Sequence, residues 1–216
     1  MPSMDKKYWE KVYSKQSEEE KPSLFAVFIA ENLGMCGKKL VELGCGNGRD
    51  AIYFANAGAK HVDAIDQCEN IINLLTYRFQ QIKNLSFHCQ DFTCMEDVTK
   101  EKKFDIIYSR FTLHSISKEQ EQKVIQWAYQ NILSGGSFCI EVRGHRNEIF
   151  GVGVPVEGET DAFILNDHYR RFLNFESFCK ELTSLGFILS FAKEQKGFAP
   201  YNNQNETYIR IIATKP

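Results

Sequence analysis

Three glycines at alternate positions follow the first apolar segment of the chain, in the run Gly44-Cys-Gly-Asn-Gly48. Glycine lets a backbone turn sharply and approach a ligand closely. A helical pattern starts at Arg49, and the free N–H groups at a helix start attract anionic groups. The run therefore predicts a ligand-binding turn between a strand and a helix. A dinucleotide fingerprint needs glycine where Arg49 stands, which argues against a nicotinamide cofactor.

Two aspartates follow the next two apolar segments. Asp66 comes directly after the segment 61–65, about 20 residues beyond the glycine turn, where a carboxylate can accept from both ribose hydroxyls. Asp91 follows the segment 85–88, and its neighbour Phe92 can cover an aromatic base. Each residue alone could be an ordinary turn or core residue. Together with the glycine turn, they predict a nucleoside site.

These residues require a fold that gathers the ends of several strands. Apolar segments 39–43, 61–65, 85–88, 104–108 and 137–142 alternate with helical patterns. Such alternation predicts parallel strands joined by right-handed crossovers, with ligands bound beyond their carboxyl ends. Segments 187–192 and 208–213 have no helix between them, so we expect them to pair antiparallel. The predicted fold is α/β, a doubly wound, seven-stranded, mostly parallel Rossmann-like sheet with a C-terminal antiparallel hairpin.

Several helices of this sheet have sequence signals of their own. Ser117 with Gln120 forms a capping-box pattern, and the helix it starts is expected to continue through Ile132 to the glycines at 135 and 136. Asn174 is expected to cap a helix that ends at Gly186. A further helix is predicted from the spacing of Ile71, Leu75, Phe79 and Ile82.

Composition excludes several classes of function. Of 216 residues, 26 are Lys or Arg and 28 are Asp or Glu, which gives a net charge of −2 and no general attraction to nucleic acid or anionic membranes. No apolar run reaches the roughly 20 residues of a membrane span, and no secretory signal is visible. The seven cysteines lack a C-x-x-C motif, which favours reduced thiols in a cytoplasmic protein. No cluster has metal-ligand spacing, so no metal is expected.

The ordered motifs V-E-L-G-C-G-N-G-R-D, D-A-I-D, Q-D-F, F-D-I-I-Y-S-R-F-T-L-H and L-S-G-G-S-F resemble those of the class I S-adenosylmethionine-dependent methyltransferases. The glycine turn looks most like the subset that acts on small molecules. The resemblance covers about residues 38–142 and implies S-adenosyl-L-methionine as cofactor, with S-adenosyl-L-homocysteine as product. The cofactor-binding residues that it implies are Gly44, Cys45, Gly46, Arg49, Asp66, Gln67, Asp91, Phe92, Ser109 and Arg110.

The methyl acceptor is expected to be small and anionic. The Asn/Asp-Pro-Pro-Tyr/Phe motif of amino-methylating nucleic-acid enzymes is absent. The Pro-Cys pair expected at the catalytic turn of a cytosine C5 methyltransferase is also absent. Cations gather after the fourth and fifth strands, which suggests a carboxylate or phosphate held by arginine. The alternative is that nearby acids balance these cations. The predicted acceptor-binding residues are Tyr8, Trp9, Tyr13, Arg110, His114, Arg143, His145, His168, Tyr169, Arg170 and Arg171.

Residues 1–34 are predicted to form an N-terminal helical lid segment and 35–216 a single methyltransferase domain, with an irregular acceptor-pocket insertion at about 144–173. A monomer and a homodimer are both possible.

His114 and Arg110 are the catalytic candidates. His114 would be the general base if the acceptor carries a proton, and a hydrogen-bond donor if the acceptor is already anionic. The alternative functions are a nicotinamide-dependent oxidoreductase and a non-catalytic cofactor-binding subunit.

Overall fold

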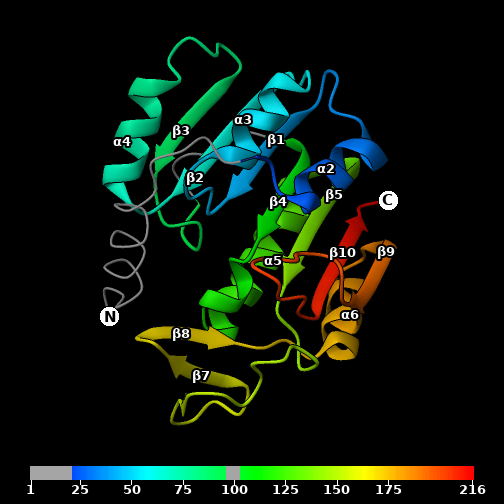
Figure 1. Ribbon diagram of the computed structural model, residues 1–216. Coiled ribbons are helices and arrows are strands. Elements are labelled where there is room, and N and C mark those ends of the chain that lie inside the picture. Colours follow the sequence, from blue (N-terminus) through cyan, green and yellow to red (C-terminus); the bar gives the residue numbers. More distant parts are fainter. Residues whose placement is uncertain (1–20, 96–102) are drawn as a thin grey trace.

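The structure is a computed structural model that describes residues 21–95 and 103–216. Seven strands form one sheet in the order β3-β2-β1-β4-β5-β10-β9 (Figure 1). Their bounds are β1 Lys39–Leu43, β2 His61–Asp66, β3 Leu85–Cys89, β4 Phe104–Arg110, β5 Ile132–Val142, β9 Ile188–Gln195 and β10 Tyr208–Thr214. The first five are parallel to one another, and β10 runs antiparallel to both β5 and β9. The predicted sheet and its C-terminal hairpin are confirmed.

Helices cover both faces of this sheet. The helices are α2 Leu24–Leu33, α3 Arg49–Asn56, α4 Glu69–Arg78, α5 Lys118–Asn131 and α6 Phe175–Ser184, with the short 3-10 helix η1 at Leu113–Ser115. One core cluster joins α5 and α6 to one face, and a second joins α2, α3 and α4 to the other. The result is a three-layer α/β/α arrangement, which leaves the carboxyl ends of the parallel strands open at one edge.

Local signals set most helix boundaries. Ser117 and Gln120 form the predicted capping box at the start of α5, and the Asn174 side chain accepts from the N–H of Ser177 at the start of α6. The helix α5 ends at Asn131, before Ile132 and well short of the glycines at 135 and 136 where it was expected to end. Ile132 takes an extended conformation and pairs with Phe104 at the start of β5. Strand pairing therefore overrides the helical spacing at that point.

The helix α2 is anchored beside the glycine turn. The Ser23 N–H and Oγ both donate to the Asp50 carboxylate at 2.7 Å, and the Tyr108 hydroxyl donates to the same group at 2.8 Å. Phe25 and Ile29 of α2 are fully buried. This network fixes the start of α2 against the first turn of α3. The predicted amphipathic segment with Tyr8, Trp9 and Tyr13 lies outside the described residues.

The sequence analysis expected the insertion at 144–173 to be irregular, but the insertion has regular secondary structure. It contains a three-stranded antiparallel sheet, β6 Val154–Pro155, β7 Ala162–Leu165 and β8 His168–Arg171. Asn166 and Asp167 form the two-residue turn between β7 and β8, with φ of 54° and 59°. Both are residues that tolerate this left-handed geometry. Figure 1 shows this small sheet beyond the carboxyl ends of β4 and β5.

Within residues 21–95 and 103–216, none of the helices has both the length and the apolar character needed to cross a membrane.

Candidate active site

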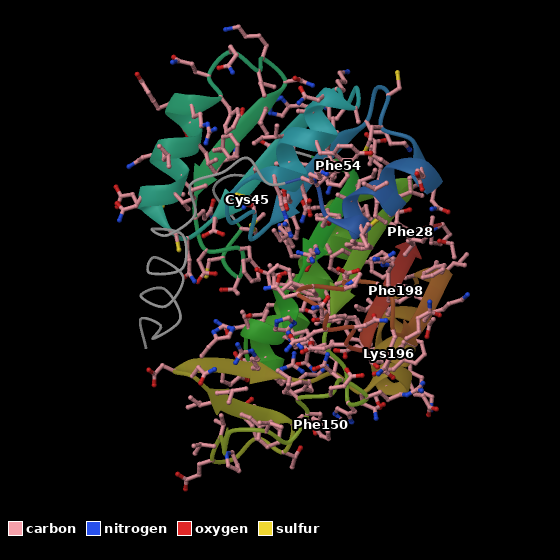
Figure 2. The ribbon with its side chains drawn as sticks, viewed as in Figure 1. Phe28, Cys45, Phe54, Phe150, Lys196 and Phe198 are labelled. Carbon is pink, nitrogen blue, oxygen red and sulfur yellow. The ribbon has the colours of Figure 1, made fainter. Side chains whose placement is uncertain are left out.

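The glycine turn after β1 packs closely against the segment after β4. Gly44 has a φ of 71°, and a Cβ added there would lie 2.4 Å from Cγ2 of Thr112. No side chain fits in that space, so Gly44 is required for packing as well as for the turn. Cys45, at the end of β1 in Figure 2, is buried, and its N–H donates to the Ile65 carbonyl at 2.8 Å. The turn is therefore tied to β2 on one side and to the end of β4 on the other.

Asp66 joins the tips of β1 and β2. Its Oδ2 accepts from the N–H of Gly46 and its Oδ1 accepts from the N–H of Cys68, both at 2.9 Å. The side chain is only 7% exposed. Each carboxylate oxygen has two lone pairs, so these contacts orient the group and leave acceptor capacity for a ligand. Gln67, the next residue, is half-buried.

Glu42, on β1, carries a buried oxygen without a hydrogen-bond partner among the described residues. The side chain is 4% exposed. Burial raises the pKa of Glu42 well above its ordinary value, and the charge of Asp50 raises it further. A buried, unpaired carboxylate oxygen is costly unless a donor or cation reaches it. The sequence analysis did not assign Glu42 a role, although it is the last residue but one of the strand that leads into the glycine turn.

The tip of β3 brings Asp91 and Phe92 to the same edge. Asp91 is exposed, and its Oδ1 accepts from both the N–H and the hydroxyl of Thr93 at 2.8 Å. Phe92 is partly buried, and its ring lies 3.8 Å from the position of a Cβ at Gly44. The strand tips that the sequence predicted to meet do lie together.

The end of β4 is more enclosed than predicted. Ser109 is fully buried, and its hydroxyl lies 2.5 Å from that of Thr112. Arg110 donates from Nε to Glu141 at 3.0 Å, and Glu141 also accepts from Arg210. The Arg210 guanidinium lies 4.8 Å from the ring of Phe28 and 4.2 Å from that of Phe198, both labelled in Figure 2. Arg110 is therefore part of a buried ionic network.

His114 is buried in η1 and surrounded by cations. The backbone N–H of Arg143 donates to its Nδ1 at 3.4 Å, and the side chain is 4% exposed. Burial lowers the pKa of His114 well below 6.5, and the charges of Arg143, His168, Arg170 and Arg171 lower it further. The ring is therefore neutral near pH 7. With Nδ1 accepting a hydrogen bond, its proton lies on Nε2.

Acids pair with most of the cations predicted to clamp the acceptor, which is the alternative that the sequence analysis left open. The pairs are Arg110 with Glu141, Arg143 with Glu206, Arg171 with Glu121, and His145 with Asp161. Arg171 also donates to the carbonyls of Leu113 and Ile116, so it ties the insertion to η1. These pairs join residues 31, 63, 50 and 16 positions apart in the chain. That separation hid them from sequence patterns.

The remaining predicted acceptor residues lie on β8. His168 is 2% exposed and, when protonated, lowers the pKa of His114. The Tyr169 hydroxyl donates to Glu159 at 2.6 Å, and Arg170 donates to the Leu165 carbonyl at 2.9 Å. The structure thus brings His168 and Arg170 to the His114 end of the site.

The β9–β10 connection contributes residues that sequence reasoning missed. The Tyr208 hydroxyl donates to Glu206 at 2.8 Å, and the Arg143 guanidinium lies 5.1 Å from the Tyr208 ring. The Tyr208 ring is tilted by 32° to the ring of Phe111, with their centroids 5.0 Å apart. An antiparallel last strand starts at the carboxyl edge of its neighbours. That geometry is the signal that could have placed Tyr208 here.

Comparison with known proteins relates part of the chain to methyltransferases. Residues 40–136 match a family described as a methyltransferase domain. A phosphoethanolamine N-methyltransferase of Plasmodium falciparum is 29% identical over 102 residues, which cover 47% of this chain and 38% of that protein. The chain therefore spans well under half the length of this curated relative.

Two solved structures share the fold at low sequence identity. The 1,6-didemethyltoxoflavin-N1-methyltransferase of Burkholderia thailandensis, with bound S-adenosylhomocysteine, has a TM-score of 0.73 and 16% identity. The alignment covers 98% of this chain and 87% of that chain. The [4+2]-cyclase SpnF has a TM-score of 0.69 and 16% identity, with 88% of this chain and 80% of that chain covered. The family match over residues 40–136 relates this part of the chain to methyltransferase domains, and the two solved structures show that the chain shares their fold.

Proposed function

We propose that the chain transfers a methyl group from S-adenosyl-L-methionine to an O, N or S atom of a small molecule that carries an anionic group. The observation that carries the proposal is the meeting at one edge of the sheet of the glycine turn, Asp66 and a Glu42 oxygen that has no hydrogen-bond partner in residues 21–95 and 103–216. A cationic sulfonium cofactor with a ribose matches an acid beside the turn and a second acid at the tip of β2.

The chemistry of these residues fits that cofactor. Glu42 supplies a buried carboxylate oxygen for its positive part, and Asp66 supplies acceptors for its ribose. Asp91 and Phe92 are assigned to its adenine. The helix α3 begins after Gly48, and the N–H of Arg49 at its start donates to Asn47 Oδ1 at 3.4 Å. The start of this helix is assigned to the cofactor's carboxylate. Ser109 and Thr112 close the floor beneath the turn.

The surroundings of His114 support an anionic acceptor. Although Arg143 and Arg171 have acidic partners, His114 feels the positive charges of both, together with Arg170. A neutral ring with its proton on Nε2 can donate to an anionic oxygen. An acceptor phosphate or carboxylate beside it would be stabilised by the same charges that keep the ring neutral. The similarity to phosphoethanolamine N-methyltransferases agrees with a phosphate-bearing acceptor.

The cofactor, when bound, supplies a methyl group that is already electrophilic because it is attached to a sulfonium. The chain therefore needs to bind both reactants, align them and exclude water. Glu42 and Asp66 hold one reactant in place. His114 orients the other by donation from Nε2, and the buried Ser109–Thr112 pair keeps the floor closed to solvent. His114 is assigned as a donor and not as a general base, because its second nitrogen already accepts from Arg143.

A cyclase and a non-catalytic cofactor-binding subunit are the two functions that compete with this proposal. The cyclase with the same fold shows that the fold alone does not determine the reaction. A non-catalytic cofactor-binding subunit would bind the cofactor without turning it over. Transfer of a labelled methyl group by the purified full chain rejects both rivals.

The experiment is an acceptor screen with methyl-labelled S-adenosyl-L-methionine. Phosphoethanolamine and ethanolamine form the first matched pair of probes, since they differ only in the phosphate. We expect methyl transfer to phosphate- or carboxylate-bearing acceptors, with kcat/KM at least tenfold above that of the matched neutral compound. A variant His114→Gln, which keeps an amide donor, is expected to retain part of that preference, whereas His114→Phe loses it. Equal rates on both members of each pair would reject the anionic acceptor.

A further inference from the structure

Phe111, directly after β4, has an unusual backbone conformation. Its φ is 60°, in the left-handed region. The other described non-glycine residues with positive φ are Asn166, Asp167, Asn202 and Asn203. Asn and Asp tolerate this region, whereas a bulky side chain pays about 1–2 kcal/mol to occupy it. Such a conformation persists only where the surroundings hold it, and it is often found at functional sites.

Contacts on several sides hold Phe111 in this conformation. Its N–H donates to the Glu141 carbonyl at 2.8 Å. The Arg110 guanidinium lies 4.1 Å from the centre of the Phe111 ring, and the Tyr208 ring centroid lies 5.0 Å away. The ring of His114 is 5.7 Å away at an angle of 44°. The side chain thus links the buried ionic network to the imidazole.

The left-handed backbone of Phe111 also turns the chain from the proposed cofactor side of the site to the proposed acceptor side. The next residue, Thr112, packs against Gly44 of the glycine turn. Two residues further on, η1 brings His114 under the backbone N–H of Arg143. Ser115 closes this turn, because its N–H donates to the Thr112 carbonyl at 2.9 Å. Thr112 therefore lies on the proposed cofactor side and His114 on the proposed acceptor side of one short turn.

We propose that Phe111 is a positioning residue whose ring, fixed between Arg110 and Tyr208, holds His114 in the orientation that binds the acceptor. The proposal rests on the proposed function of His114 as a donor to the acceptor. Phe111 itself has no contact with either reactant in this account. The strained backbone is retained because a glycine, asparagine or aspartate would satisfy the turn but would leave the imidazole without its aromatic neighbour.

Substitutions separate the backbone requirement from the ring. Phe111→Asn accepts the left-handed conformation and removes the ring, whereas Phe111→Tyr keeps the ring. The matched control is Asn166→Gly, which relieves positive φ at an exposed turn of the insertion. The full chain is labelled with ¹⁵N in its histidine rings. The signal of His114 is assigned by its loss in His114→Gln.

In Phe111→Asn we expect the His114 ring signals to shift and its titration to move toward the ordinary histidine range. We expect kcat/KM for the acceptor to fall roughly 10- to 100-fold, as for a misplaced reacting group. Affinity for S-adenosyl-L-methionine should change less than about threefold, since the glycine turn is retained. Phe111→Tyr and Asn166→Gly should match the wild-type chain in every measurement.

Unchanged His114 signals in a folded Phe111→Asn chain would overturn the proposal, whether or not the chain is an active methyltransferase. If Phe111→Asn fails to fold, the comparison of Phe111→Tyr with Phe111→Leu decides instead. Leucine fills the space but does not stack, so we expect displaced His114 signals with leucine and native signals with tyrosine. Identical signals in these two variants would equally reject the proposal.

Discussion

Asp66 Oδ2 accepts a hydrogen bond from the N–H of Gly46 at 2.9 Å, so one carboxylate fixes the glycine turn to the tip of β2. The group that we assign to the ribose therefore also shapes the turn that surrounds the cofactor. Its loss should weaken cofactor binding in two ways, by removing an acceptor and by releasing the turn.

We predict that Asp66→Asn weakens S-adenosyl-L-methionine binding roughly 10- to 100-fold, the effect of losing a hydrogen bond to a charged group. Calorimetric titration measures the affinity. Asp167→Asn, the same change at an exposed turn of the insertion, is the matched control and should bind as the wild type. A folded Asp66→Asn chain with wild-type affinity would contradict the assignment of Asp66.

The second prediction concerns pH and His114. The folded chain holds the pKa of His114 well below 6.5, while the unfolded chain takes up the proton near that value. The free energy of unfolding should therefore fall as the pH drops below about 6.5, with a slope of up to about 1.4 kcal/mol per pH unit from this group. Urea unfolding at pH 7.5 and 5.5 measures the slope. His114→Gln should be less sensitive to pH, and equal slopes in both chains would count against the buried neutral ring.

The third prediction concerns Glu42, which should change the pH dependence of the free energy of unfolding in the opposite direction. Its pKa in the folded chain is raised well above 4.5, so ionised Glu42 destabilises the fold, and stability is lost as the pH rises from about 4.5 through the folded-state pKa. Glu42→Gln should therefore unfold at a higher temperature than the wild type at pH 7.5, and the difference should shrink at pH 4.5.

The same variant should bind the cofactor less well, because the neutral amide offers no charge to its cationic part. We expect an affinity for S-adenosyl-L-methionine at least tenfold weaker at pH 7.5, with a smaller loss for S-adenosyl-L-homocysteine, which lacks the sulfonium charge. Equal losses for both compounds would place Glu42 away from the sulfonium. If Glu42→Gln is less stable than the wild type and binds S-adenosyl-L-methionine with wild-type affinity, Glu42 is not part of the cofactor site.

Local signals were sufficient to predict the sheet and most helix ends. The capping box of Ser117 and the cap at Asn174 act within three or four residues, so both are visible in sequence. The small sheet in the insertion was missed, although Asn166 and Asp167, which tolerate positive φ, follow the apolar stretch 162–165 and could have indicated a hairpin. The pairing of Arg171 with Glu121 could not be predicted, because only the tertiary fold brings residues of β8 and α5 together.

The ion pair of Arg171 with Glu121 leads to a prediction about the stability of the fold, and not about acceptor binding. Arg171→Met leaves Glu121, which is fully buried, with the half-exposed Lys118 as its one cationic partner among the residues that the structure describes. We expect a loss of about 3 kcal/mol in the free energy of unfolding, the usual cost of breaking a buried ion pair. Adding Glu121→Leu should recover much of it. Lys123→Met, at the exposed pair with Glu119, is the control and should leave stability unchanged. Wild-type stability in Arg171→Met would show that the pair is dispensable.

The most direct test of the central claim is calorimetric titration of the full chain with S-adenosyl-L-methionine and, separately, with NADH. We expect saturable binding of S-adenosyl-L-methionine at one site and no heat of binding with NADH. Binding of NADH together with a flat titration of S-adenosyl-L-methionine would contradict it.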